Sequence, residues 1–139
     1  NNGFTEDGAI LLAEALEKNS SLTELSIAQN SLGPNGIKKV TEALKANKSL
    51  NMLRLDGNMI GDKGAKYIAN LLKVNQSIEE LYLNSNDIAD TGTSNLAKSL
   101  KRNRTLVRLS LADNVISHNG FAAFADMIAE NVSLVWISL

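Results

Sequence analysis

The chain has 139 residues, a net charge of −1, 44% hydrophobic residues and no cysteine. Without cysteine it can form no disulfide and use no thiolate chemistry. Its near-neutral charge gives no long-range field for nucleic acid or an anionic membrane. It also lacks the run of about eighteen apolar residues that a membrane-spanning helix needs, so we expect neither kind of partner.

One pattern repeats along the chain at a fixed spacing. Its clearest copy is LNMLRLDGNMI over residues 50–60, which has the form LxxLxLxxNxI. A copy begins every 28 residues, without insertion or deletion, at Leu22, Leu50, Ile78, Leu106 and Leu134. Because a constant period of this length is typical of solenoid proteins, it decides the fold class before any other feature.

In chain order, the pattern predicts a single array of repeats over 1–139. It comprises a partial repeat 1–21, complete repeats 22–49, 50–77, 78–105 and 106–133, and a partial repeat 134–139. Terminal repeats of a solenoid normally differ from the inner ones because they cover the open core. Neither end differs here, so we expect a section of a longer array.

Each repeat is expected to contain a short strand and then a helix. Leu25 and Ile27 alternate with Glu24, Ser26 and Ala28, which is the period of two of a strand with one buried face. Further along, buried positions recur at i, i+3 and i+7, as on one face of a helix. These positions are Ala9, Leu12, Leu16; Ile37, Val40, Leu44; Ala65, Ile68, Leu72; Thr93, Leu96, Leu100; and Phe121, Phe124, Ile128.

Helix ends are predicted from three kinds of residue. Residues that are mostly suited to an N-cap precede each predicted helix. Pro34 follows one of them, at the first helical position, where its missing N–H costs nothing. Acidic residues such as Asp62 suit the positive end of the helix dipole. The N-cap column is Thr5, Gly33, Gly61, Ala89 and Ser117. An asparagine, which tolerates the left-handed backbone that stops a helix, is expected to end each one. These are Asn19, Asn47, Asn75, Asn103 and Asn131.

Two further columns hold the same residue in every repeat. A glycine in the first helical turn is about 0.5–1 kcal/mol less favourable than alanine, so the column predicts a close approach that a Cβ would block. It comprises Gly8, Gly36, Gly64, Gly92 and Gly120. An asparagine after each strand can donate and accept, so we expect it to satisfy turn backbone and to bridge repeats. That ladder is Asn2, Asn30, Asn58, Asn86 and Asn114.

The full unit, LxxLxLxxNxIxxxGxxxLxxxLxxNxS, resembles the ribonuclease-inhibitor-like class of leucine-rich repeats over essentially the whole chain. The resemblance implies an α/β solenoid, or horseshoe, with a parallel β-sheet on the concave face and α-helices on the convex face. Geometry predicts the same curvature, because strands stack about 4.8 Å apart whereas helices need about 10 Å. The repeats look similar to the arrays of NOD-like receptors, and more distantly to tropomodulin and the Ran GTPase-activating protein.

The concave strand face is the predicted binding surface for a protein partner. Its outward side chains vary between repeats on a regular scaffold, and Tyr, Trp and Arg are common interface hot spots. The predicted residues are Glu24, Met52, Arg54, Asp56, Glu80, Tyr82, Asn84, Arg108 and Trp136.

Structural roles are the alternative for several of these residues. Glu80 can pair with Arg108 on the adjacent strand, Arg54 can lie over the Tyr82 ring, and Trp136 can pack against a following repeat. The basic run of Lys98, Lys101, Arg102, Arg104 and Arg108 could likewise attract an acidic partner or only complement a helix C-terminus.

No catalytic, cofactor-binding or metal-binding residue is predicted. The single histidine, His118, has no cysteine or Ser–Asp constellation around it, and the five Asn-x-Ser/Thr sequences arise from the repeat itself. We therefore expect a non-enzymatic, cytoplasmic scaffold for protein–protein interaction, without a small-molecule substrate. Two alternatives stay open: a ligand-sensing or autoinhibitory region of a NOD-like-receptor-type protein, and a GTPase-activating-type regulator of a small GTPase.

Overall fold

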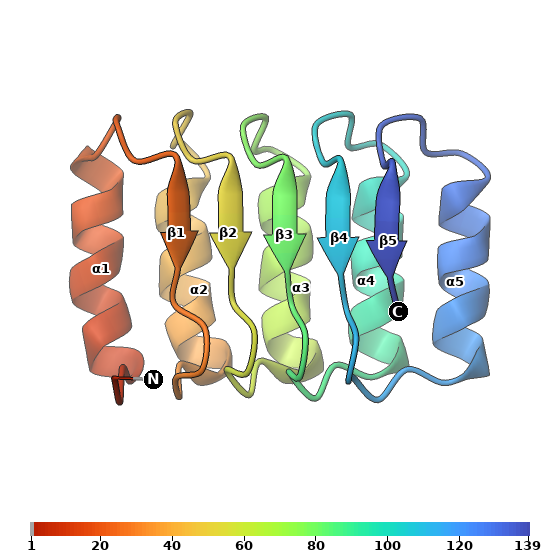
Figure 1. The fold of residues 1–139 in the computed structure, drawn as a ribbon, viewed down its shortest axis with the longest axis horizontal. Helices are drawn as coiled ribbons and strands as arrows, with labels where there is room; N and C mark the ends of the chain where they lie inside the picture. Colours follow the sequence, from red (N-terminus) through yellow and green to blue (C-terminus); the bar gives the residue numbers. More distant parts are fainter. Residues whose placement is uncertain (1) are drawn as a thin grey trace.

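The computed structural model describes residues 2–139, in which helices and three-residue strands alternate. The helices are α1 (Glu6–Lys18), α2 (Gly33–Leu44), α3 (Gly61–Leu72), α4 (Asp90–Leu100) and α5 (His118–Ile128). The strands are β1 (Glu24–Ser26), β2 (Met52–Arg54), β3 (Glu80–Tyr82), β4 (Arg108–Ser110) and β5 (Trp136–Ser138). The strands form one parallel sheet in chain order, and all the helices lie on one side of it (Figure 1).

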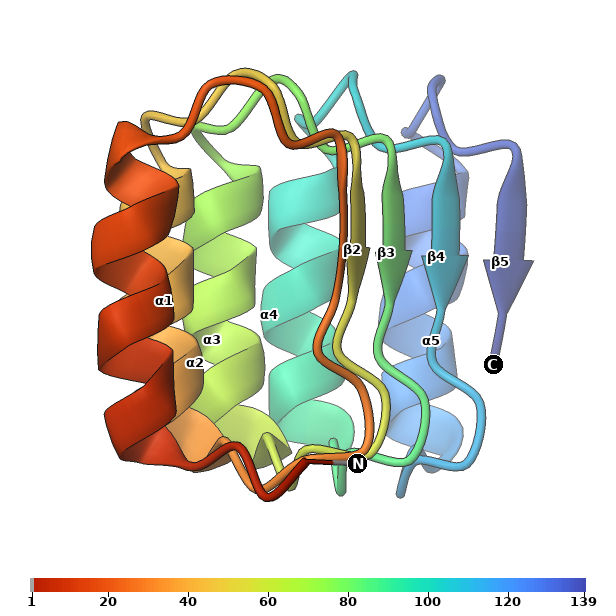
Figure 2. The ribbon, with the colours of Figure 1, turned by 60° about the vertical axis from the view of Figure 1, so that its left-hand side comes forward.

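The repeat length sets the register of the sheet. Leu25 lies beside Leu53, and Leu53 beside Leu81, so each residue pairs with the one 28 positions further on. Figure 2 shows the sheet and the helices as two separate layers. The row of helices is wider than the row of strands (Figure 1), so the strand side is the inner face of the curve. The predicted α/β solenoid is therefore confirmed.

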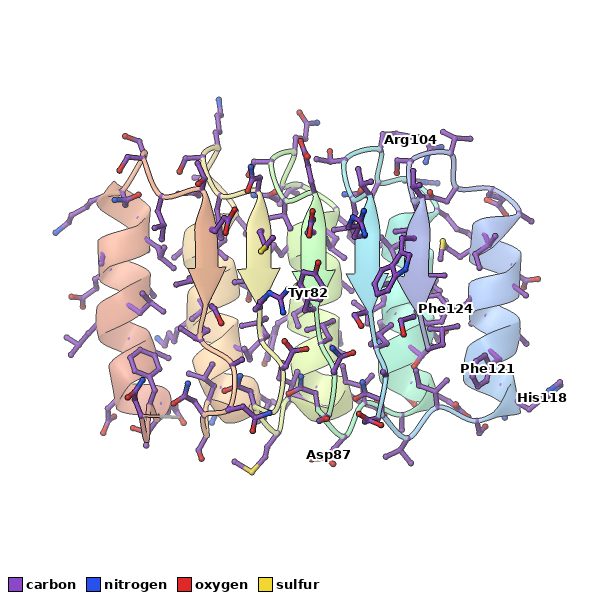
Figure 3. The ribbon with its side chains drawn as sticks, in the orientation of Figure 1. Tyr82, Asp87, Arg104, His118, Phe121 and Phe124 are labelled. Carbon is purple, nitrogen blue, oxygen red and sulfur yellow. The ribbon has the colours of Figure 1, made fainter. Side chains whose placement is uncertain are left out.

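The core lies between the two layers and repeats with them. Leu53 and Leu55 from the β2 region meet Ile68 and Leu72 from α3, and all four are buried. The predicted helical stripes are buried throughout α2, α3 and α4. In α5 the prediction is wrong for Phe121 and Ile128 (Figure 3 labels Phe121), which are 47% and 51% exposed. The reason is that α5 packs against α4 on one side and has no helix on the other.

The glycine column is explained by close packing at the start of each helix. A Cβ on Gly92 would lie 2.6 Å from Asp62 Oδ1 and 2.9 Å from the Ala65 side chain, both on α3. A Cβ on Gly120 would lie 2.7 Å from Asp90 Oδ1 in the same way. The predicted close approach is confirmed. At Gly92 and Gly120 the approaching groups include an acidic side chain of the preceding helix, whereas at Gly36 and Gly64 they include the apolar side chains of Leu32 and Ile60.

These acidic side chains also correct the prediction for the helix starts. Asp62 Oδ1 accepts from Ala89 N and Gly92 N, both at 2.8 Å, so it caps α4 rather than its own helix. Asp90 caps α5 through Ser117 N and Gly120 N. The predicted N-cap position is confirmed for Thr5, Ala89 and Ser117, but Gly33 and Gly61 are the first residues of their helices. Within this column only Ser117 accepts a side-chain cap bond, from Asn119 N at 3.4 Å. The caps thus join one repeat to the next.

The prediction that an asparagine stops each helix in a left-handed conformation is wrong. Asn19 has φ −86°, and no member of its column has a positive φ. The helices α2 to α5 end three residues earlier, and the asparagine amides satisfy the following turn instead. Asn103 Oδ1 accepts from Thr105 N and Leu106 N, while its Nδ2 donates to Leu72 O of the preceding repeat at 2.9 Å.

The ladder predicted after the strands is confirmed. Asn86 Nδ2 donates to Leu55 O in the preceding repeat and to Asn84 O in its own, and its Oδ1 accepts from Asn58 N at 2.7 Å. Asn58 and Asn114 make the equivalent bonds to carbonyls of the preceding repeat. The structure therefore has two asparagine ladders, one at each edge of the array, and the sequence pattern identified one of them.

Candidate binding surface

The nine predicted residues all lie on or directly after strands. The register brings the first outward position of each strand into one row across the sheet, in the order Glu24, Met52, Glu80, Arg108 and Trp136. A second row holds Arg54 beside Tyr82. Figure 3 shows Tyr82 on the side of β3 that faces away from the helices, which is the inner face of the array.

Four of the nine form a connected group, which we call the Tyr82 cluster: Arg54, Glu80, Tyr82 and Arg108. The Tyr82 hydroxyl donates to Glu80 Oε2 at 2.6 Å, and Arg108 Nε lies 3.8 Å from Glu80 Oε1. The Arg54 guanidinium carbon lies 4.0 Å from the centre of the Tyr82 ring, which is cation–π distance. The structure therefore contains both contacts that the sequence suggested, namely Glu80 with Arg108 and Arg54 with Tyr82.

The cluster also changes the acidity of its phenol. The bond to the Glu80 carboxylate raises the pKa of Tyr82 above its ordinary 10.0, helped by burial and the Glu80 charge and opposed by Arg54 and Arg108. A donated hydrogen bond stabilises the protonated phenol, which explains the direction. The cluster is thus a fixed arrangement of two cations, a carboxylate and a ring across three neighbouring strands.

The remaining residues of the row flank this cluster. Trp136 lies on β5 beside Arg108 and is 40% exposed. Together with Ile128, Leu134 and Val135 it also lines a hollow of about 190 Å³ at the end of the array. Met52 is half-buried between its neighbours, and Glu24 is exposed on the first strand.

Asp56 and Asn84 are largely used within the array. Asp56 Oδ1 accepts from Asn84 N at 2.9 Å. Asn84 Oδ1 accepts from Ser110 Oγ at 2.6 Å and from Ala112 N at 2.8 Å. Both residues therefore tie neighbouring repeats together.

Nothing in residues 2–139 gathers three or more metal-ligating side chains of the His, Cys, Asp or Glu type. His118 is exposed at the start of α5, away from the sheet (Figure 3). Among the same residues, no helix is long and apolar enough to cross a membrane. One of the hollows that the sequence did not predict lies between the ends of α3 and α4, and it joins side chains from two repeats.

Comparison with known proteins places the chain among repeat proteins. A solved structure described as leiomodin-1 actin-binding site 2 has a TM-score of 0.86 and 25% identity, covering 91% of this chain and 75% of that one. The tropomodulin C-terminal domain from Caenorhabditis elegans has a TM-score of 0.82 and 20% identity, covering 96% and 81%. That second likeness shows the fold alone. No curated protein sequence matches.

The family described as leucine-rich repeat matches four segments, residues 18–40, 46–69, 74–97 and 102–125. Together these segments include more than half of the chain, and each spans a strand and most of the following helix. The chain belongs to the leucine-rich repeat family.

Proposed function

We propose that this chain is a non-enzymatic protein-interaction module that binds its partner on the inner strand face, around the Tyr82 cluster. The observation that carries the proposal is the fixed contact of Arg54, Tyr82, Glu80 and Arg108, with Trp136 exposed beside it. Arg, Tyr and Trp are the residue types that dominate binding energy at protein interfaces.

The internal contacts of the cluster favour binding. Side chains that are already held in place lose less conformational entropy when a partner arrives. Arg54 and Arg108 stay exposed while Glu80 neutralises one of the two positive charges. A partner that presents a carboxylate or a carbonyl oxygen would therefore complement the cluster best.

Actin is the first candidate partner. The likeness to the leiomodin-1 structure, described as an actin-binding site, extends over 91% of this chain at 25% identity. Binding is measured with fluorescently labelled monomeric actin and by co-sedimentation with filaments. Binding that is weakened about tenfold or more by Tyr82→Ala or Arg54→Ala, but not by Lys39→Ala on the exposed side of α2, supports both the partner and the face. Absence of binding removes actin.

The face can be tested without a known partner. A photo-crosslinking amino acid at position 54 or 82 is compared with the same amino acid at position 39. Specific adducts from positions 54 and 82, absent at position 39, support the inner face. Adducts only at position 39 would contradict it.

A role as a regulator of a small GTPase is the alternative from a different class. It predicts faster GTP hydrolysis by a candidate GTPase when this chain is added, whereas a scaffold leaves the rate unchanged. We propose a cytoplasmic location. The NOD-like-receptor alternative stays a prediction from the repeat pattern alone.

A further inference from the structure

A basic hollow lies on the helix side of the array, between the ends of α3 and α4. Its volume is about 300 Å³, and it is lined by Lys73, Lys98, Ser99, Arg102 and Asn103. All three charged residues in the lining are cations. The two neutral side chains are already bonded, Ser99 Oγ to Leu96 O and Asn103 Nδ2 to Leu72 O, so the floor is rigid.

The structure divides the basic run seen in the sequence into two groups. Lys101 pairs with Glu130 at 2.6 Å, and Arg108 faces Glu80 in the Tyr82 cluster. Arg104 donates to the backbone carbonyls of Lys101 and Asn103, so it caps the end of α4. These three cations have internal roles.

Lys98 and Arg102 are the other group. Both side chains are exposed, and within residues 2–139 neither has a hydrogen bond or an ion pair. Lys73 adds a third positive charge from the preceding repeat, and its Nζ bonds only to the neutral Asn70 Oδ1, at 3.1 Å. The hollow therefore collects three positive charges, and none of them forms an ion pair with a carboxylate of residues 2–139.

Complementing the helix dipole does not account for this arrangement. The dipole favours cations only within the last turn of a helix, and the corresponding cation at the end of α2, the C-cap residue Lys45, is already paired with Glu42. The positions that correspond to Lys98 in the other repeats are Glu14, Glu42, Asn70 and Asp126. The concentration of positive charge is thus particular to the junction of α3 and α4, on a chain of net charge −1.

We propose that this hollow binds an acidic segment of a protein partner, through carboxylates that meet Lys73, Lys98 and Arg102. Nucleic acid would need a long basic track, since its phosphates continue in both directions. Here the repeats before and after the hollow contribute Glu42 and Glu130, which pair with Lys45 and Lys101. The site lies on the opposite layer from the Tyr82 cluster and is independent of it.

The test measures binding of a fluorescein-labelled hexaglutamate peptide by anisotropy at low salt, with hexaglutamine as the uncharged probe. The double variant Lys98→Gln/Arg102→Gln should bind hexaglutamate about 3–10-fold more weakly, because it removes two of the three positive charges and each exposed ion pair contributes only modestly. The matched control, Lys39→Gln/Lys66→Gln, removes two exposed cations from α2 and α3 and should change binding less than about twofold. Circular dichroism checks that both variants are folded.

Three results would overturn the proposal: equal losses in the two double variants, no binding of hexaglutamate to the unmodified chain, or tighter binding of a hexadeoxythymidine probe. Tyr82→Ala should leave hexaglutamate binding within about twofold. Failure of the inner-face proposal therefore does not affect this one, and the two can be judged separately.

Discussion

Tyr82 is the residue whose chemistry reports most directly on the inner face. Its bond to Glu80 holds the phenol protonated and raises its pKa above 10.0, while Arg54 and Arg108 act in the opposite direction. In a Tyr67→Phe background, absorbance titration should show Tyr82 ionising above pH 10.0. Adding Glu80→Gln should lower that pKa, because the carboxylate is removed and both arginines stay. An unchanged pKa would mean that the cluster does not form.

Asp90, at the start of α5, also has a pKa that its hydrogen bonds shift, but in the opposite direction. Its carboxylate accepts from Ser117 Oγ at 2.6 Å and from Ser117 N at 2.8 Å, and these bonds lower its pKa below 3.8. The stabilisation is therefore complete above pH 3.8 and is lost as the pH falls through the lower pKa of the folded state.

The prediction follows from that sign. Asp90→Asn should have a lower urea midpoint than the unmodified chain at pH 6, and the difference should shrink as the pH falls below 3.8. Glu79→Gln serves as the control, because it removes one exposed charge that has no side-chain bond. A difference that stays constant with pH would contradict the role of the Asp90 carboxylate.

The connections between strands and helices depend on the asparagine ladder. Removing the Asn86 amide leaves Asn58 N without its acceptor, and it takes one of two donors from Leu55 O and one of two from Asn84 O. A buried group left unbonded costs about 1–3 kcal/mol, so Asn86→Ala should lower the free energy of unfolding by about that amount. Asn58→Ala should also lower it, but by less, because each of the three carbonyls that Asn58 Nδ2 binds keeps a second donor. Urea titration measures it, with the exposed Asn51→Ala as control. Midpoints equal to that control would show that the ladder carries no stability.

Elements of this fold were predictable where their signal lies within one repeat. The alternation around Leu53 and the spacing of Ile68 and Leu72 identified the strands and helices, and the fixed period gave the register. Asn103 and Asp62 were misinterpreted because their partners, Leu72 O and Ala89 N, lie in neighbouring repeats. The tendency of asparagine to stop a helix is a property of one residue, whereas the hydrogen bonds of Asn103 and Asp62 depend on how neighbouring repeats stack.

The same distinction applies to the candidate sites. The alternation of the strands placed all nine residues on one side of the array, and the contacts of Arg54 and Glu80 were considered from their spacing. The bonds of Asn84 within the array and the shared hollow of Lys73 and Lys98 could not be predicted, because they depend on side-chain conformations that the repeat pattern does not specify.

In a protein of these 139 residues, stability should vary along the length of the array. Each repeat packs only on its neighbours, so an inner helix is covered on two sides and an end helix on one. The exposure of Phe121 and Ile128 on α5 is the consequence. In hydrogen exchange on a protein of these 139 residues, amides of α3 and β3 should be the most protected and those of α5 and β5 the least, because opening can begin at an end. Uniform protection along the chain would indicate a single cooperative unit and would contradict this prediction.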